Sequence, residues 1–193
     1  DVRKFFASID QNMLLTILTK HIEDKDILNL LKTIIQSFQS TEKGKGLPLG
    51  NLTSQLLVNI YMNVFDQYMK RVLKTKYYIR YADDFVIMSQ DKKYLEFVLV
   101  EIEKFLSEKL KLNLHPDKVF IKTLYSGVDF LGWVHFPKHR TLRTVTKKRM
   151  FKKLEGEPKK ETIQSYLGLL GHGNAKKLQS NIENLMDINC SSL

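Results

Sequence analysis

Two adjacent carboxylates, Asp83 and Asp84, are the residues of this chain best suited to chemistry. Two short runs rich in aromatic and β-branched residues, 77–80 and 85–88, flank them without proline or glycine. Such runs predict the two strands of a hairpin, with the carboxylates at its turn. Neighbouring carboxylates repel each other and lose hydration on burial, and a divalent cation relieves both costs. Because Mg²⁺ binds one or two carboxylates together with substrate phosphates, the pair favours a phosphoryl-transfer site.

A site with two metal ions about 4 Å apart needs a further carboxylate from a neighbouring segment. Asp1 is the candidate, because it opens a segment, residues 1–6, that we predict to be a strand. We therefore take Asp1, Asp83 and Asp84 as the catalytic set, acting as metal ligands rather than as general acids or bases. The alternative for Asp83 and Asp84 is a solvated turn.

Four motifs together resemble those of the reverse transcriptases, and they occur in that family's order. They are residues 1–6 for the first catalytic motif, residues 46–55 for the nucleotide-and-template motif, Tyr81-Ala82-Asp83-Asp84 for the catalytic hairpin and Phe130-Leu131-Gly132-Trp133 for the primer-grip hairpin. The resemblance covers residues 1 to about 136. It implies an RNA-directed DNA polymerase that joins deoxynucleotides to a primer 3′-OH with two Mg²⁺ ions, for which Mn²⁺ can substitute.

The second motif narrows the resemblance. Leu49 stands where group II intron and retroviral relatives usually carry Gln, and Gln55 stands where intron enzymes often carry Pro. This pattern, and the later residues 165–174, are similar to reverse transcriptases of bacterial and phage diversity-generating retroelements. A related bacterial defence enzyme that makes DNA with little or no template is the alternative.

The resemblance also implies roles for individual residues. The main-chain oxygen of Val2 would be a further metal ligand, and the Phe6 ring would lie beneath the incoming sugar and exclude a ribose 2′-hydroxyl. The other residues implied are Pro48, Leu49, Gly50 and Gln55 near the nascent base pair, Lys118 near the triphosphate, and Leu131, Gly132 and Trp133 at the primer end. The alternatives are core packing for Phe6 and Trp133 and a solvated surface for Lys118.

The 193-residue chain has a formal net charge of +10, which favours a polyanionic partner. Basic residues gather late in the sequence, and a helix that carries them could follow a phosphate backbone. Those we expect to do so are Lys147, Lys148, Arg149, Lys152 and Lys153. The alternative is a solvated helix face.

Composition also limits location and partners. A single cysteine, Cys190, excludes a disulfide within the chain and fits a reducing compartment. No apolar run reaches membrane-spanning length, so we expect no membrane partner. The resemblance to bacterial and phage retroelement enzymes implies a cytoplasmic location in a bacterial or phage-infected cell. The resemblance implies an RNA template, a DNA or RNA primer, deoxynucleoside triphosphates and, for diversity-generating elements, a small basic accessory protein.

The order of elements predicts an α+β fold. We expect a polymerase palm at residues 1–137, with an antiparallel sheet covered by helices on one face, and a small α-helical thumb at residues 138–193. Asp10 should cap the first helix. The helices are expected near residues 13–22, 26–38, 53–73, 92–110, 147–154, 160–170 and 174–186, and further strands at 119–124 and 130–136.

The chain starts at Asp1 without methionine, and the relatives carry fingers before their first motif. We therefore expect a fragment without fingers that is nearly inactive by itself. A non-catalytic nucleic-acid-binding module is the alternative for such a fragment. A palm-fold nucleotide cyclase is disfavoured by residues 46–55 and 130–133.

Overall fold

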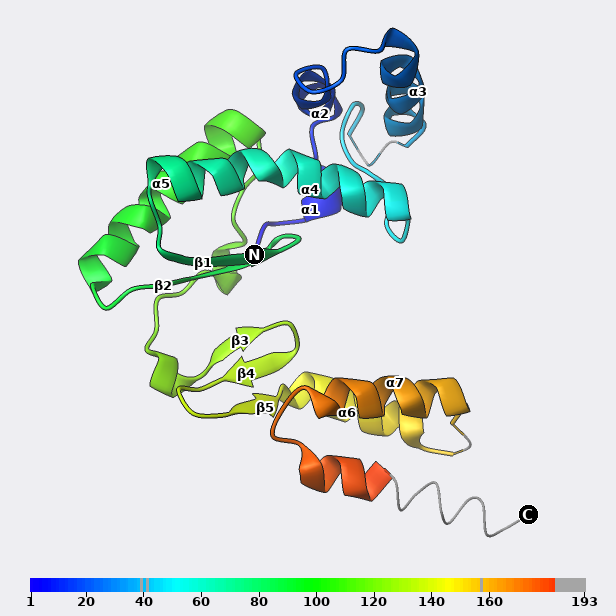
Figure 1. Cartoon of the computed structure of the whole chain (residues 1–193), viewed down its shortest axis with the longest axis vertical. Coiled ribbons are helices and arrows are strands. Elements are labelled where there is room, and N and C mark those ends of the chain that lie inside the picture. The colour runs from blue at the N-terminus through cyan, green and yellow to red at the C-terminus, as the bar shows by residue number, and fades with distance from the viewer. Residues whose placement is uncertain (39, 41, 157, 183–193) are drawn as a thin grey trace. The chain divides into compact units, whose positions relative to one another are not determined.

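The computed structural model describes residues 1–38, 40, 42–156 and 158–182. The chain divides into two compact units, Asp1–Ile121 and Lys122–Leu193, which are described separately (Figure 1). Helices and small antiparallel sheets occur together, which confirms the predicted α+β class. The packing boundary falls before the predicted one at residue 137, because the strands of residues 128–142 pack with the helices that follow them. The assignment of palm and thumb remains a prediction.

The first unit is mainly helical. Its helices are α1 (Phe5–Ser8), α2 (Gln11–Leu18), α3 (Lys25–Gln36), α4 (Leu52–Gln67), the π-helical turn η1 (Tyr68–Val72) and α5 (Lys92–Leu110). Asp10, Asp24 and Asp91 cap α2, α3 and α5, because each side chain accepts hydrogen bonds from backbone N–H groups of the first turn. Asp10 also pairs with Lys111 at 2.9 Å. The predicted cap and the predicted helices 26–38 and 92–110 are confirmed.

The prediction of a strand at residues 1–6 is wrong. Val2 makes only an isolated antiparallel bridge with Leu114, and α1 begins at Phe5. Phe5, at the start of α1, and Ile9, directly after its end, are both buried, so packing into the core accompanies the helical turn. Lys4 reverses the chain between the two parts with a φ of 47°.

The predicted catalytic hairpin is confirmed. Strands β1 (Tyr77–Tyr81) and β2 (Asp84–Met88) pair antiparallel with Tyr81 opposite Asp84, so the loop consists of Ala82 and Asp83. A two-stranded hairpin is marginal without packing. Here Phe65 of α4 packs against the rings of Tyr78 and Phe85, and so holds the hairpin on the core.

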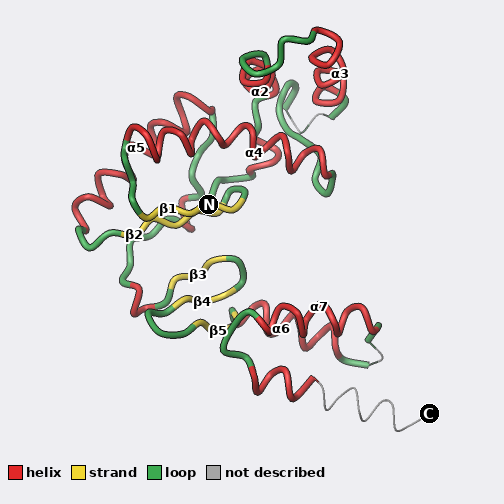
Figure 2. Tube along the Cα trace, in the orientation of Figure 1, coloured by secondary structure: helices red, strands yellow, loops and turns green. Residues whose placement is uncertain are grey.

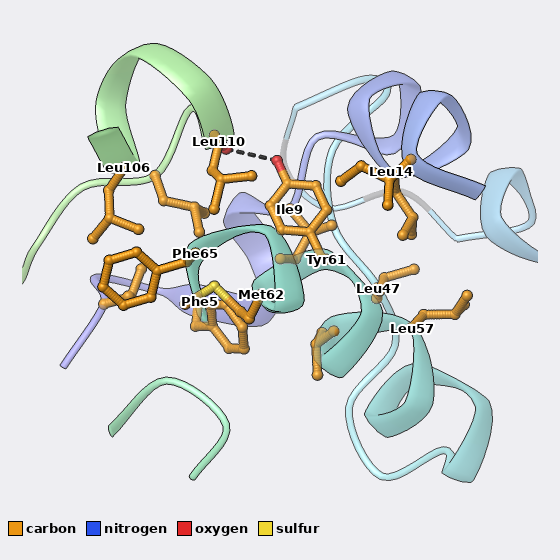
Figure 3. Packing of buried hydrophobic residues seen from close by; sticks show 14 of the residues in the cluster. Phe5, Ile9, Leu14, Leu47, Leu57, Tyr61, Met62, Phe65, Leu106 and Leu110 are labelled. Atoms are coloured by element: carbon orange, nitrogen blue, oxygen red, sulfur yellow. Dashed lines mark hydrogen bonds between the residues drawn. The ribbon is translucent and has the colours of Figure 1, made fainter. Parts of the chain in front are cut away.

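The core of the first unit surrounds α4. Tyr61 and Phe65 of this helix are fully buried among side chains of α1, α2, the loop before α4 and α5 (Figure 3). The Tyr61 hydroxyl donates a hydrogen bond of 2.6 Å to the carbonyl of Leu110, which satisfies both groups. This packing fixes the helix on which the hairpin rests.

The second unit combines a small sheet with helices (Figure 2). Its elements are β3 (Val128–Phe130), β4 (Trp133–His135), β5 (Arg140–Leu142), α6 (Thr144–Leu154), α7 (Lys160–Gly171) and a helical segment at residues 176–182. Buried Trp133 packs closely on Gly173, where a Cβ would lie 2.1 Å from the indole ring. Two short 3₁₀ turns, η2 (Pro116–Lys118) and η3 (Leu124–Ser126), precede the sheet.

Two strand predictions near the boundary between the units need correction. Residues 119–123 belong to no strand, and Leu131 and Gly132 form a turn that divides the expected strand 130–136 into β3 and β4. The predicted helix 174–186 is described as far as residue 182, and its remainder and Cys190 lie outside the described residues. None of the helices searched, all among the described residues, is long and apolar enough to cross a membrane.

Candidate active site

The hairpin loop that carries Asp83 is anchored to α4 by Arg80. The guanidinium donates two hydrogen bonds to the Asp66 carboxylate, from Nε at 2.8 Å and from Nη2 at 2.6 Å. Its remaining nitrogen, Nη1, donates to the carbonyl of Ala82 at 2.7 Å. Tyr78 donates to the same carboxylate at 2.6 Å. Arg80 therefore ties the loop, through Ala82, to the central helix.

The charges of this network are held in place by one another. Burial alone would raise the pKa of Asp66, but hydrogen bonds from Arg80 and Tyr78 outweigh it and hold that pKa below its usual range. Burial and the neighbouring carboxylate raise the pKa of Tyr78, so the phenol stays protonated and donates. The network thus consists of the ion pair between Arg80 and Asp66, to which the neutral Tyr78 hydroxyl donates a hydrogen bond.

The backbone of Asp1 is held by residues that follow α5. Arg3 donates to the carbonyl of Asn113 at 2.9 Å, and His115 donates to the carbonyl of Asp1 at 3.0 Å. The Asp1 carboxylate, which is mostly buried, forms an ion pair with Lys118. The structure therefore places Lys118 directly beside the first predicted metal ligand.

Electrostatic interactions connect Asp1 and Lys118 with the hairpin loop. The pKa of Asp83 is raised, chiefly by burial and further by the charge of Asp84. The positive charge of Lys118 acts in the opposite direction. Lys118 thus pairs with Asp1 and also acts on Asp83, which comes from a different segment of the chain.

The donor chemistry of this cluster suits Mg²⁺, which prefers carboxylate oxygens. Among the described residues, however, no group of three His, Cys, Asp or Glu side chains is arranged to hold a metal ion. Lys118 instead neutralises the Asp1 carboxylate. The cluster therefore fits a cation that takes one or two carboxylates and completes its shell with phosphate oxygens, rather than a cage made only of protein ligands.

The loop before α4 lies against Phe6. Leu47 donates its N–H to the carbonyl of Phe6 at 2.9 Å, so Pro48 follows directly after a residue bonded to the predicted sugar gate. Phe6 is half-buried at the edge of the core, whereas Phe5 is fully buried, as expected for a core residue. The geometry therefore groups Phe6 and Pro48, and the role of the Phe6 ring stays a prediction.

Residues after Pro48 face solvent. Leu49 is 76% exposed, and Gly50, with a φ of 86°, and Gln55 are exposed as well. Buried Gln11 holds the start of this loop in place. Its amide nitrogen donates a hydrogen bond of 3.0 Å to the carbonyl of Gly46, and it also donates to the carbonyls of Ile35 and Phe38. Gln11 was not among the predicted residues.

The three predicted primer-grip residues, Leu131, Gly132 and Trp133, lie in the second unit and differ from one another in their exposure to solvent. Leu131 and Gly132 form the two-residue loop between β3 and β4 with φ values of 53° and 81°. Leu131 is exposed at this tip, whereas Trp133 is 4% exposed in the core. Of the two roles we considered for Trp133, core packing is thus observed, and contact with a primer remains a prediction for all three residues.

The predicted basic helix is present as α6. Met150 and Leu154 face the core of the second unit, and the five predicted cations are exposed. These are Lys147, Lys148, Arg149, Lys152 and Lys153. Their exposure makes the surface available to phosphates without showing that it binds them.

The most important residues that sequence reasoning missed are Arg80 and Asp66. The exposure of β1 alternates, and Arg80 occupies an inward position of that alternation. A charged residue at an inward strand position needs a partner of opposite charge. This requirement was the sequence signal that Arg80 takes part in a buried interaction. The partner could not be identified, because Asp66 lies 14 residues earlier on α4.

Comparison with known proteins identifies the family. Residues 1–135 match the model of the reverse transcriptase (RNA-dependent DNA polymerase) family, and the chain therefore belongs to that family. Similar proteins include a putative COX1/OXI3 intron 2 protein of Saccharomyces cerevisiae, 23% identical over 69% of this chain and 23% of its own length.

Two bacterial proteins are also similar. Protein YkfC of Escherichia coli is 30% identical over 74% of this chain and 46% of its own length. The group II intron-encoded protein LtrA of Lactococcus lactis is 32% identical over 67% of this chain and 18% of its own length. The chain thus spans less than half the length of each of these relatives. The predicted family is confirmed, and the diversity-generating subgroup remains a prediction.

Proposed function

We propose that this chain supplies the catalytic palm of an RNA-directed DNA polymerase that adds deoxynucleotides to a primer 3′-OH. The observation that carries the proposal is the grouping of Asp1, Asp83 and Asp84 around one hairpin loop, beside Lys118. Membership of the reverse transcriptase family supports it. Carboxylates that a divalent cation can draw together suit two-metal nucleotidyl transfer better than a structural role.

In this proposal Asp1, Asp83 and Asp84, with the main-chain oxygen of Val2, hold Mg²⁺ or Mn²⁺. When bound, the metal ions activate the primer hydroxyl and stabilise charge on the leaving pyrophosphate. Lys118, which pairs with Asp1, would contact a phosphate oxygen of the incoming nucleotide. Arg80 and Asp66 position the loop, and the Phe6 ring lies against the sugar.

Nucleic acid would be bound by two further groups of residues. The exposed cations of α6 would contact phosphates, and the exposed Leu131 tip would touch the primer end. We propose a bacterial or phage retroelement origin, with an RNA template and a cytoplasmic site of action. The pattern at Leu49 and Gln55 supports a diversity-generating element, with a small basic accessory protein, and the intron-encoded relatives indicate a second possible group.

Primer extension by the full-length protein on poly-rA with oligo-dT tests the proposal. Asp83→Asn should abolish DNA synthesis in both Mg²⁺ and Mn²⁺. Asp26→Asn is the matched control, because Asp26 is an exposed carboxylate on α3, away from the hairpin, and it should leave synthesis unchanged. DNA synthesis that survives Asp83→Asn would refute the catalytic role of Asp83. Nucleic-acid binding without any synthesis by the unsubstituted protein would instead make the chain a non-catalytic nucleic-acid-binding module.

A further inference from the structure

A second concentration of positive charge lies at the end of the β1–β2 hairpin away from the catalytic loop. Lys70, Arg71, Lys74 and Lys76 occupy four of seven consecutive positions, and no acidic residue occurs from position 67 to position 82. All four side chains belong to exposed residues. The basic face of α6 belongs to the other unit.

The fold enlarges the cluster with residues from α5. The Tyr94 hydroxyl of α5 contacts buried Thr75 at 3.4 Å, which joins the start of α5 to the segment between η1 and β1. Figure 1 shows the end of η1 and the starts of β1 and α5 at one end of this unit. Exposed Lys93 directly precedes Tyr94, so its backbone lies at the same end of the unit. We call Lys70, Arg71, Lys74, Lys76 and Lys93 the distal basic patch.

Internal ion pairs do not account for these charges. In the described part of the chain, no salt bridge involves a member of the distal basic patch. Of the nearby acidic groups, Asp91 caps α5 and Glu96 pairs with Lys92 at 3.5 Å. Asp66, whose pKa the charge of Lys70 helps to lower, forms its ion pair with Arg80. Lys76 instead lies 5.2 Å from the ring centre of Tyr77, which is itself half-exposed. Cations beside an exposed aromatic ring are typical of surfaces that bind single-stranded nucleic acid.

Lys74 also adopts an unfavourable backbone conformation. Its φ of 50° lies in the left-handed region, which costs a residue with a side chain about 1 kcal/mol. Glycine is the usual residue where a helix ends in this way. A lysine at this position is therefore not explained by local structure, which favours a use for its charge.

We propose that the distal basic patch binds the phosphate backbone of a nucleic-acid strand. The proposal rests on the proposed function only in taking nucleic acid as the polyanion. Tyr77 and Tyr81 lie four residues apart along β1, so the patch is about 13 Å from the catalytic loop along the strand. The patch therefore contacts a part of the strand away from the reacting nucleotide, and binding there needs no metal ion.

Binding of a fluorescein-labelled oligo-uridine to the 193-residue chain, measured by anisotropy at several salt concentrations without divalent cations, tests the proposal. Each phosphate contact on a single strand contributes about 0.7 to the slope of log K against log salt. Replacing Lys70, Arg71, Lys74 and Lys76 by Gln should therefore reduce the slope by about two to three. A matched variant with Gln at Lys20, Lys25, Lys32 and Lys104 removes the same charge from exposed positions elsewhere in the unit. It should change the slope much less.

Lys74→Gly separates binding from folding. This variant relieves the unfavourable φ, so it should unfold at the same or a higher denaturant concentration while the slope falls by about 0.7. Equal slope changes in the patch variant and its matched control would overturn the proposal, because net charge alone would then explain binding. Binding of an acidic peptide but not of oligo-uridine would also overturn it. Neither outcome affects the Asp83→Asn test of catalysis.

Discussion

Replacing Arg80 tests whether the catalytic loop is held by the network on α4. Arg80→Met keeps the length of the side chain but removes two hydrogen bonds to Asp66 and one to Ala82. The Arg80 side chain is 9% exposed and that of Asp66 28%, so the pair is only partly shielded from water. We therefore expect a loss of about 3 kcal/mol, at the lower end of the range for breaking a buried ion pair.

Hydrogen exchange in β1 and β2 measures this loss where it occurs. About 3 kcal/mol corresponds to exchange that is faster by about a hundredfold. Arg80→Lys keeps the charge but cannot form the two-pronged contact, so its effect should be intermediate. The single tryptophan, Trp133, belongs to the second unit, and its fluorescence should be unchanged as an internal control.

The sign of the pH dependence follows from Asp66. Because its pKa is lowered in the folded state, the stabilisation is complete above the unfolded pKa near 3.8 and is lost as pH falls below it. Asp66→Asn should remove this part of the acid sensitivity. Arg80→Met and Asp66→Asn share one interaction, so their combined effect should be smaller than the sum. Additive effects, or unchanged exchange in Arg80→Met, would refute the reasoning.

Three further predictions concern single residues. Burial and the charge of Asp84 raise the pKa of Asp83, so ionised Asp83 destabilises the folded state at neutral pH. Asp83→Asn should therefore raise the thermal midpoint while primer extension is lost. A lowered midpoint would point to a structural role. Phe6→Ala in the full-length protein should raise ribonucleotide incorporation relative to deoxynucleotide, and unchanged discrimination with lower stability would make Phe6 a core residue. Leu131 has a φ of 53°, a left-handed conformation that is unfavourable for a residue with a side chain, so Leu131→Gly should stabilise the second unit by about 1 kcal/mol. Trp133 fluorescence during urea unfolding measures this change, and a loss of stability would contradict the prediction.

Local signals predicted much of the fold. Asp10 and Asp91 are followed by apolar residues at helical spacing, and the helices they cap begin where expected. The prediction of a strand at residues 1–6 was wrong because tertiary contacts determine the secondary structure of such short segments. Phe5 enters the core from a helical turn, and Val2 finds only Leu114 as a bridge partner. Within residues 130–136, Gly132 was a sequence signal against one continuous strand, because glycine permits the turn that divides this segment.

The candidate site was predictable in its residues but not in its supports. The doublet Asp83 and Asp84 is a local pattern, and the hairpin around it forms with the expected strands. The contacts of Arg80 with Asp66 and of Lys118 with Asp1 join positions that are 14 and 117 residues apart. Such pairs depend on how α4 and the segment after α5 pack, which no local pattern in the sequence records.

The central claim is that Asp1, Asp83 and Asp84 form one cation site beside Lys118. Titration of the 193-residue chain with Mn²⁺ in the presence of a deoxynucleoside triphosphate, followed by NMR, tests this claim most directly. The account predicts paramagnetic broadening centred on Asp83 and Asp84 and extending to Asp1 and Lys118, and its loss in Asp83→Asn. Broadening centred on other carboxylates, or unchanged in Asp83→Asn, would contradict it.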